Sequence, residues 1–239
     1  MSAKLGFSRE EIAGRYDIRE LVEDKWHEHS TIEYYAFLRE VMQDIKPRLT
    51  PYLALNAGCG VYSLFMDGWD EVGIDIFLKP LLGKPSRVCG NIEGLPFASE
   101  SFDGVACVGE VLAYCKPSLA LKEMARVLKP GGPLVFDFGS TRSARFWMTS
   151  HYGRAADIVT VPYNGRPERT WVYDPEYMMS LVEECGCDVV EVRGIHSFSC
   201  LARKVGISVT NSIYVERALS KLIRLTGFSD TIMVWAKKR

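Results

Sequence analysis

Short apolar runs alternate with segments of helical spacing in the middle of the chain. The apolar runs occupy residues 52–57, 71–76, 86–91, 104–109 and 133–138. Runs of this length are typical of buried strands, and their alternation with helical segments is the pattern of βαβ units, whose crossovers are right-handed. We therefore predict an α/β domain built on a parallel sheet.

The segments before and after this core have different patterns. Residues 8–47 carry apolar side chains at helical spacing, so one or two amphipathic helices are predicted ahead of the first strand. The later part is predicted to contain a loop-rich stretch at 139–172, a helix at 174–185, a strand at 188–195, an amphipathic segment near 212–225 and a last strand at 231–238. We expect one domain over residues 1–239, divided into a helical segment 1–50, a core 51–138, an insertion 139–173 and a C-terminal part 174–239.

Composition and charge narrow the class of protein. The chain has 239 residues, of which 47% are apolar, and its formal net charge is -1. This balance offers no broad cationic surface to phosphates, so nucleic-acid binding is not expected and a small-molecule substrate is favoured. No apolar run has the length of a signal-peptide core or approaches the roughly 20 residues of a membrane span, so we expect a cytoplasmic protein without a membrane role. Cys185 and Cys187 are the closest pair of cysteines, their spacing is not that of zinc sites, and no metal site is expected.

A turn with two glycines follows the first predicted strand. In YLALNAGCG, Gly58 and Gly60 let the backbone turn sharply and approach a ligand, and the next helix offers free N–H donors at its N-terminus. Asp75 ends the second apolar run, where a carboxylate can accept hydrogen bonds from both hydroxyls of a ribose. Two simpler interpretations stay open: the glycines can form a structural turn, and Asp75 can cap the next helix.

Two longer segments carry a family resemblance. GLPFASESFDGV and MARVLKPGGPLVFDF resemble, nearly residue for residue, the LPF, FD and RVLKPGG signatures of the class I S-adenosylmethionine-dependent methyltransferases. The resemblance implies a Rossmann-like sheet of seven strands, mostly parallel with the final strand antiparallel, with helices on both faces and S-adenosyl-L-methionine as cofactor. In RVLKPGG we expect Pro130 to break the helix and Gly131 and Gly132 to supply positive backbone angles, without a catalytic role.

The resemblance also assigns cofactor-binding roles along the core. It places the methionine half of the cofactor against the glycine turn and the end of the fourth strand, the ribose on the second strand, and the adenine between the second and third. The residues expected to bind the cofactor are Asn56, Gly58, Cys59, Gly60, Asp75, Ile76, Asn91, Ile92, Val108 and Gly109. Two positions depart from the family pattern: Asn56 replaces an acidic residue, and Tyr62 replaces the third glycine of the turn. The site thereby loses one negative charge and gains bulk, so we expect the amino group of the cofactor to be held less tightly.

Catalytic residues are harder to assign. In families of this architecture a segment such as 1–50 folds over the site as a lid, and aromatic and histidine side chains are concentrated there, although ordinary core packing explains them as well. The weak candidates are His29, Tyr34 and His151, since histidine can act as a general base near neutral pH. Methyl transfer can also proceed by positioning of the reactants alone.

The acceptor is expected beside the insertion 139–173, at the carboxyl edge of the sheet. Its arginines can hold an anionic group of the substrate or lie in a solvated loop. The amphipathic segment near 212–225 is predicted to pack on the domain or on a second copy in a homodimer. We interpret the chain as a methyltransferase for a small molecule; the alternatives are a catalytically silent member acting as a binding partner or regulator and, more remotely, a dehydrogenase.

Overall fold

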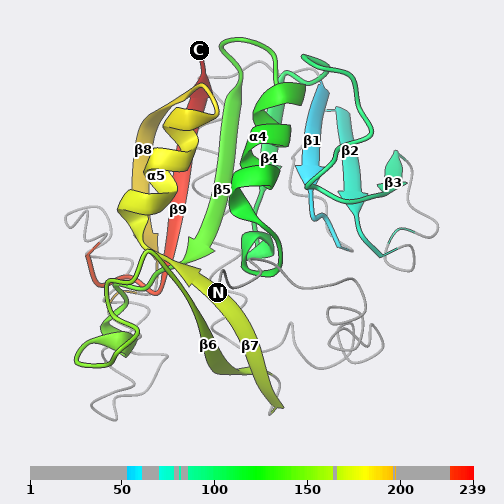
Figure 1. The fold of residues 1–239 in the computed structure, drawn as a ribbon. Coiled ribbons are helices and arrows are strands. Elements are labelled where there is room, and N and C mark those ends of the chain that lie inside the picture. Colours follow the sequence, from blue (N-terminus) through cyan, green and yellow to red (C-terminus); the bar gives the residue numbers. More distant parts are fainter. Residues whose placement is uncertain are drawn as a thin grey trace.

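The computed structural model describes residues 53–60, 70–77, 81, 86–163, 166–195, 197 and 227–239. Its central sheet has seven strands in the order β3-β2-β1-β4-β5-β9-β8 (Figure 1). The strands are β1 (Leu53–Ala57), β2 (Asp70–Asp75), β3 (Arg87–Cys89), β4 (Gly104–Cys107), β5 (Pro133–Gly139), β8 (Cys187–Ile195) and β9 (Thr231–Lys238). Strands β1 to β5 pair in parallel, whereas β9 is antiparallel to both β5 and β8. The predicted sheet, with its antiparallel final strand, is confirmed.

The strand order reverses between β1 and β4, which are neighbours in the sheet although β2 and β3 lie between them in the chain. In open α/β sheets, ligands bind outside the carboxyl ends of the strands at such a reversal. The fold therefore directs attention to the residues that follow β1, β2 and β4.

Helices α4 (Pro117–Val127) and α5 (Pro175–Glu184) cover one face of the sheet (Figure 1). Their apolar sides meet alternate strand residues in one buried core that includes Leu55, Phe136, Met124 and Val182. The segment 1–50, which was predicted to be helical, lies outside the described residues.

The insertion 139–173 corrects one sequence expectation. It was predicted to be loop-rich, but it contains the antiparallel strands β6 (Ala156–Tyr163) and β7 (Arg166–Tyr173), after the short 3₁₀ helix η4 (Ala144–Phe146). Val159 and Val172 pack with Phe146, while Trp171 belongs to the main core. Apolar side chains buried on two sides replace the simple alternation of a strand, which hides the hairpin in the sequence. The hairpin extends beyond the carboxyl end of β5 (Figure 1).

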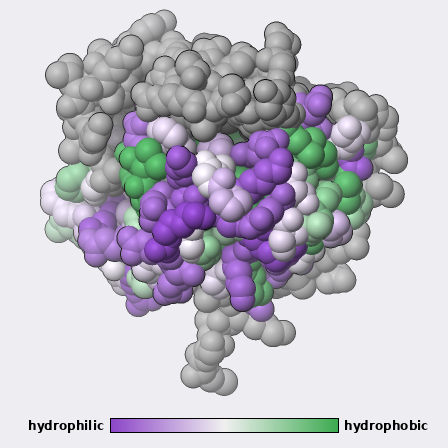
Figure 2. All heavy atoms as spheres, turned by 90° about the horizontal axis from the view of Figure 1, so that it is seen from above, coloured by the Kyte–Doolittle hydropathy of each residue, from purple (hydrophilic) through white to green (hydrophobic). Residues whose placement is uncertain are grey.

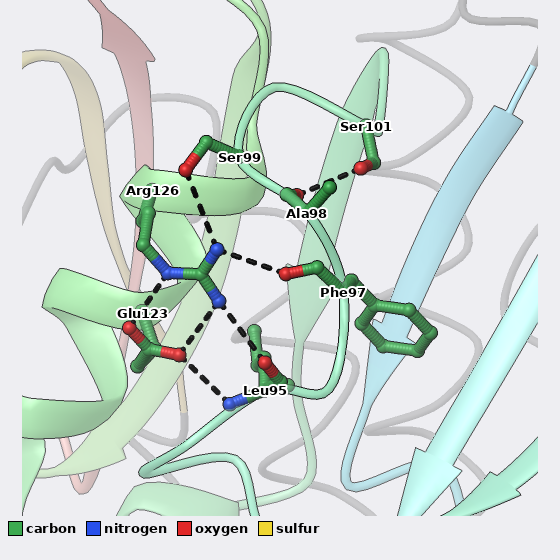
Figure 3. A network of polar contacts seen from close by, with 7 residues as sticks. All are labelled: Leu95, Phe97, Ala98, Ser99, Ser101, Glu123 and Arg126. Atoms are coloured by element: carbon green, nitrogen blue, oxygen red, sulfur yellow. Dashed lines mark hydrogen bonds and ion pairs between the residues drawn. The ribbon is translucent and has the colours of Figure 1, made fainter.

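Arg126 of α4 joins two of the family signatures (Figure 3). Its guanidinium donates to both carboxylate oxygens of Glu123 at 2.8 Å, to the carbonyl of Phe97 at 2.9 Å and to that of Leu95 at 3.0 Å. Phe97 also packs edge-on against Phe102, with ring centroids 5.0 Å apart. The LPF segment is thus held against the helix that leads into RVLKPGG.

Asp103, of the FD signature, lies where β1 and β4 begin. Its carboxylate accepts from the Leu53 N–H at 3.0 Å and from the Lys129 ammonium at 2.7 Å. Viewed from this end, the visible described surface is mostly hydrophilic, with smaller hydrophobic patches (Figure 2). None of the helices in the described part of the chain is long and apolar enough to cross a membrane.

The RVLKPGG turn was predicted correctly, but for partly wrong reasons. α4 ends at Val127, and Leu128 is already extended, so Pro130 lies beyond the end of the helix and does not break it. Gly131 has the expected positive φ of 76°, but Gly132 does not. A Cβ on Gly132 would lie 2.6 Å from Leu128 Cδ1 and 2.8 Å from the Asp103 carbonyl oxygen. Gly132 is therefore required for close approach of the backbone.

Candidate cofactor site and its carboxyl-edge neighbours

The turn after β1 is bound to the end of β2. The N–H groups of Gly58 and Cys59 donate to the carbonyl of Ile74 at 2.8 and 3.0 Å, and the Gly60 N–H donates to Asp75 Oδ2 at 2.9 Å. Gly58 has a φ of 76°, and a Cβ there would lie 2.5 Å from a methyl group of Val111. At Gly60, with φ of 49°, no described atom lies within 4 Å of the place a Cβ would take. The first glycine is needed for packing, whereas at the second no atom of the described residues meets the place of a Cβ.

Asp75 links the turn to the next segment. Its second oxygen, Oδ1, accepts from the Phe77 N–H at 3.0 Å, which is the bond expected of a capping residue. Each carboxylate oxygen has two lone pairs, so both can accept a further hydrogen bond from a ligand hydroxyl. Burial raises the pKa of Asp75, and the N–H donors of Phe77 and Gly60 oppose that rise. The capping and ribose-binding interpretations of Asp75 are thus compatible with one another.

Asn56 lies buried beneath the turn, beside an ion pair. Its Nδ2 donates to Glu71 Oε1 at 3.2 Å, and the same oxygen lies 2.6 Å from Arg87 Nη1. Both side chains of that ion pair are 8% exposed. An acidic residue at position 56 would place its carboxylate at hydrogen-bond distance from that of Glu71, and two like charges in contact repel one another. The amide is therefore the residue that fits this neighbourhood.

The end of β4 is held by a buried carboxylate. Val108 is buried, Gly109 has a φ of 94°, and the N–H groups of Gly109 and Glu110 donate to Asp137 at 3.0 and 2.8 Å. Asp137 lies within β5 and is 0% exposed. Burial raises its pKa to about 6, against the effect of the two N–H donors. One carboxylate from β5 thus fixes the backbone where the methionine half of a cofactor is expected.

Sequence reasoning missed several polar residues at this edge. Glu110 accepts from the Thr231 hydroxyl at 2.8 Å, and Glu168 of the hairpin accepts from the Tyr114 hydroxyl at 2.8 Å. Asp137 could have been found as the one charged residue in the apolar run PLVFDF, and Glu110 as the acid directly after Gly109. Thr231 and Glu168 had no such signal, because only the folded chain brings them to Glu110 and Tyr114.

The fold agrees with comparisons to known proteins. Residues 55–136 match a family model described as a methyltransferase domain. A demethylmenaquinone methyltransferase from Paenarthrobacter aurescens is 31% identical over 175 residues, which cover 69% of this chain and 67% of that protein. The chain belongs to the class I S-adenosylmethionine-dependent methyltransferases.

Other relatives differ in their acceptors by name. A malonyl-[acyl-carrier protein] O-methyltransferase from Herminiimonas arsenicoxydans is 33% identical over 105 residues, or 40% of each chain. The human protein named "Probable tRNA methyltransferase 9B" is 27% identical over 243 residues, or 83% of this chain and 47% of that one. The chain thus spans less than half the length of these two relatives. The solved PH0226 protein from Pyrococcus horikoshii has the same fold, with a TM-score of 0.65 at 14% identity over 98% of this chain and 100% of that one.

S-adenosylmethionine is the cofactor of this family, and the described residues fit it. Three features lie at the carboxyl ends of adjacent strands: Gly60, beside which no described atom meets the place of a Cβ, the hydrogen-bonding capacity of the Asp75 carboxylate, and the exposed Gly109. Ile76 is half-buried directly after Asp75, and Ile92 is buried after β3. Asn91 is exposed, and its side-chain oxygen accepts from the Glu93 N–H at 2.9 Å. The adenine contacts of Asn91 and Ile92 stay predictions.

Cys59 is buried in the glycine turn. Its thiol donates to the Gly60 carbonyl across 3.6 Å, and burial raises its pKa to about 12. The side chain is therefore a neutral thiol in this methyltransferase fold, and its expected contribution to the site is packing and backbone geometry.

Of the three weak catalytic candidates, His151 is the one that lies among the described residues. His151 lies in the insertion, where its Nδ1 is 2.8 Å from Asp157 Oδ2 and its ring packs edge-on against Phe146. His29 and Tyr34 lie outside the described residues, as does Tyr62. A catalytic role for any of the three candidates stays a prediction.

Three of the arginines in the insertion have acidic partners. Arg142 binds Asp174 and Glu176, Arg145 binds Asp230, and Arg154 binds Asp157. The pairs of Arg142 and Arg145 attach the insertion to the start of α5 and to the segment before β9, whereas the pair of Arg154 lies within the insertion. They are contacts within the fold, so these guanidinium groups have a structural role that does not depend on a substrate.

Proposed function

We propose that this chain transfers a methyl group from S-adenosylmethionine to a small-molecule acceptor. The observation that carries the proposal is the hydrogen bond between the Gly60 N–H and the Asp75 carboxylate, at 2.9 Å. It joins the glycine turn of β1 to the expected ribose-binding carboxylate of β2, so the chain itself holds the two parts of a nucleoside site in position relative to one another. Such preorganisation lowers the entropic cost of binding.

The residues of the site would divide the cofactor among three strands. Gly58 and Gly60 would bring backbone against the methionine half, Asp75 would accept the ribose hydroxyls, and Val108 with Gly109 would border the sulfonium. The bound cofactor supplies an electrophilic methyl group. The chain's own contribution is to align the acceptor with that group and to exclude water, which can account for much of the rate.

Charge supports a small acceptor over a nucleic acid. The net charge is -1, and Arg142, Arg145 and Arg154 of the insertion are engaged with carboxylates. Binding of a nucleic acid depends on cations that neutralise several phosphates. The tRNA methyltransferase among the relatives makes tRNA the acceptor to exclude by experiment.

Three measurements test this function. S-adenosylmethionine and S-adenosylhomocysteine should bind with micromolar dissociation constants, as measured by calorimetry, and at ~100 times that constant S-adenosylhomocysteine should stabilise the fold by ~2.7 kcal/mol. NAD should cause no shift in melting temperature, and a shift with NAD alone would indicate a dehydrogenase. Radiolabelled methyl groups should then enter the small-molecule fraction of a cell extract. Label found only in tRNA would overturn the choice of acceptor.

The second candidate is a catalytically silent member of the family. The observation that favours it is Asn56, which replaces the acidic residue of the family pattern and donates to Glu71. A silent member would bind neither S-adenosyl compound, or would bind both without transferring label to any fraction. Calorimetry followed by the labelling assay separates these outcomes.

A further inference from the structure

Glu110 directly follows Gly109 and is held by two other strands. Its N–H donates to Asp137 Oδ1 of β5 at 2.8 Å, and its Oε1 accepts from the Thr231 hydroxyl of β9 at 2.8 Å. Its φ is 58°, in the left-handed region that non-glycine residues rarely adopt. Strained residues of this kind persist where the surroundings determine them, and they are concentrated at active sites.

The carboxylate of Glu110 lies toward the insertion, beside which the acceptor is expected. Thr231 pairs with Gly139, the last residue of β5, so the hydroxyl that binds Glu110 stands at the carboxyl end of the sheet where the insertion begins. Gly109, on the other side, borders the expected position of the methyl donor. The Glu110 side chain therefore extends from the cofactor edge of β4 toward the insertion.

The charged groups around Glu110 come from three elements. Burial is the main cause that raises its pKa, and the carboxylates of Asp230 and Glu168 act in the same direction. The Thr231 hydroxyl and the Arg145 guanidinium oppose the rise, and Arg145 is itself paired with Asp230. A carboxylate whose pKa lies nearer neutrality is a better proton acceptor at physiological pH than an ordinary glutamate.

We propose that Glu110 is the general base of the methyl transfer and that Thr231 is its positioning residue. This inference rests on the proposed function. As the bond from the methyl carbon to the acceptor oxygen or nitrogen forms, the carbon–sulfur bond breaks and its electron pair stays on sulfur. The acceptor's O–H or N–H proton moves to a carboxylate oxygen of Glu110 and then to water. The acceptor is accordingly a hydroxyl or amine compound that carries its proton at neutral pH, and not a carboxylate or a thiolate.

Sinefungin tests this placement without knowledge of the acceptor. In sinefungin, an amine-bearing carbon replaces the methylated sulfonium, so an ammonium group lies where the methyl group would leave. S-adenosylhomocysteine has no group there. If Glu110 faces the reacting atoms, Glu110→Gln should lower the affinity for sinefungin by at least tenfold. The affinity for S-adenosylhomocysteine should change by less than twofold, as measured by calorimetry on the full chain.

Three further variants separate placement from folding and from net charge. Thr231→Val removes the hydroxyl that holds the carboxylate and should lower the preference for sinefungin over S-adenosylhomocysteine about threefold, whereas Thr231→Ser should restore it. Glu184→Gln, on the exposed side of α5, loses the same charge and should change neither affinity. Thermal melting in the presence of S-adenosylhomocysteine confirms that each variant is folded.

The possible outcomes are distinct. If wild-type protein binds neither compound, the proposed function fails. If it binds both and Glu110→Gln weakens them equally, or weakens neither, the function stands and the role of Glu110 is overturned. If an acceptor found in the labelling assay is a carboxylate or a thiol, the general-base role is overturned as well.

Discussion

The two ends of the parallel strands differ in how they hold polar groups. At the amino end, polar side chains pair with one another and with backbone groups, and these bonds join separate segments. At the carboxyl end, carboxylates are held in positions that raise their pKa values. Asp103 and Arg126 belong to the first end and its adjoining helix, and their partners are an ammonium, a carboxylate and backbone groups. Asp75, Asp137 and Glu110 belong to the second, and burial raises the pKa of each.

The difference explains what the family signatures encode. LPF, FD and RVLKPGG meet one another around Arg126, Asp103 and Gly132, and none of these residues lies at the carboxyl edge. The signatures by which the family is recognised therefore stabilise the fold. The carboxylates of the opposite edge carry a cost in burial, which is the usual trade where binding and chemistry take place.

The largest expected effect concerns the pH dependence of stability through Asp137. Its pKa is about 6 in the folded chain, against an ordinary value of 3.8, so between these values the folded state binds more protons than the unfolded state. Stability from this group therefore falls as the pH rises through this window, by about 3 kcal/mol at most. Asp137→Asn should remove that slope, as measured by urea unfolding from pH 4 to pH 7.

Comparison of wild type with Asp137→Asn isolates the contribution of Asp137 to the pH dependence, because Asp75 and Glu110 titrate in both proteins. The variant should be less stable than wild type at pH 4, since one of the two N–H groups loses its acceptor, and the two stability curves should approach one another toward pH 7. Parallel curves would show that the Asp137 carboxylate titrates normally.

Arg126→Ala should cause the next largest loss, about 2.5 kcal/mol of unfolding free energy. It removes hydrogen bonds to two carbonyl groups and to Glu123, and charge-assisted bonds are the stronger kind. Lys122→Ala, at an exposed position of the same helix, should cost less than about 0.5 kcal/mol. The folded Arg126→Ala variant should bind S-adenosylhomocysteine as wild type does. A weakened affinity would contradict the assignment of stability to the amino end and of binding to the carboxyl end.

The sequence predicted one end of this molecule better than the other. The seven strands and the positive φ of Gly131 follow from local sequence pattern, whereas Gly132 is required by its close approach to Leu128 and Asp103. The contacts of Glu110 with Thr231 and of Tyr114 with Glu168 join residues 121 and 54 positions apart, so no local pattern could predict them. The hairpin in the insertion was missed for a related reason, since its strands bury side chains against two different neighbours.

Asp75→Ala tests the role of the carboxyl end in ligand binding. It should weaken S-adenosylhomocysteine binding about 30-fold, or ~2 kcal/mol, because the ribose hydroxyls lose a charged acceptor. Stability without ligand should change by less than about 1 kcal/mol, since the loss of the bonds to Gly60 and Phe77 is offset by removal of a partly buried charge. Calorimetry and urea unfolding measure the two effects separately. A large loss of stability with unchanged affinity would identify Asp75 as a cap alone.

The smallest expected effect compares two glycines that carry no chemistry. In Gly132→Ala the new methyl group would meet the carbonyl of Asp103 at 2.8 Å and the side chain of Leu128 at 2.6 Å. Leu128 can shift, but the backbone oxygen cannot move without disturbing the start of β4, so we expect a loss of about 1.5 kcal/mol. Gly94→Ala, where no described atom lies within 4 Å of the added carbon, should be neutral in urea unfolding. The strain introduced by Gly132→Ala lies at the amino end of the sheet, so cofactor affinity should be unchanged in both variants. A changed affinity in either variant would show that strain at one end of the sheet affects the other end.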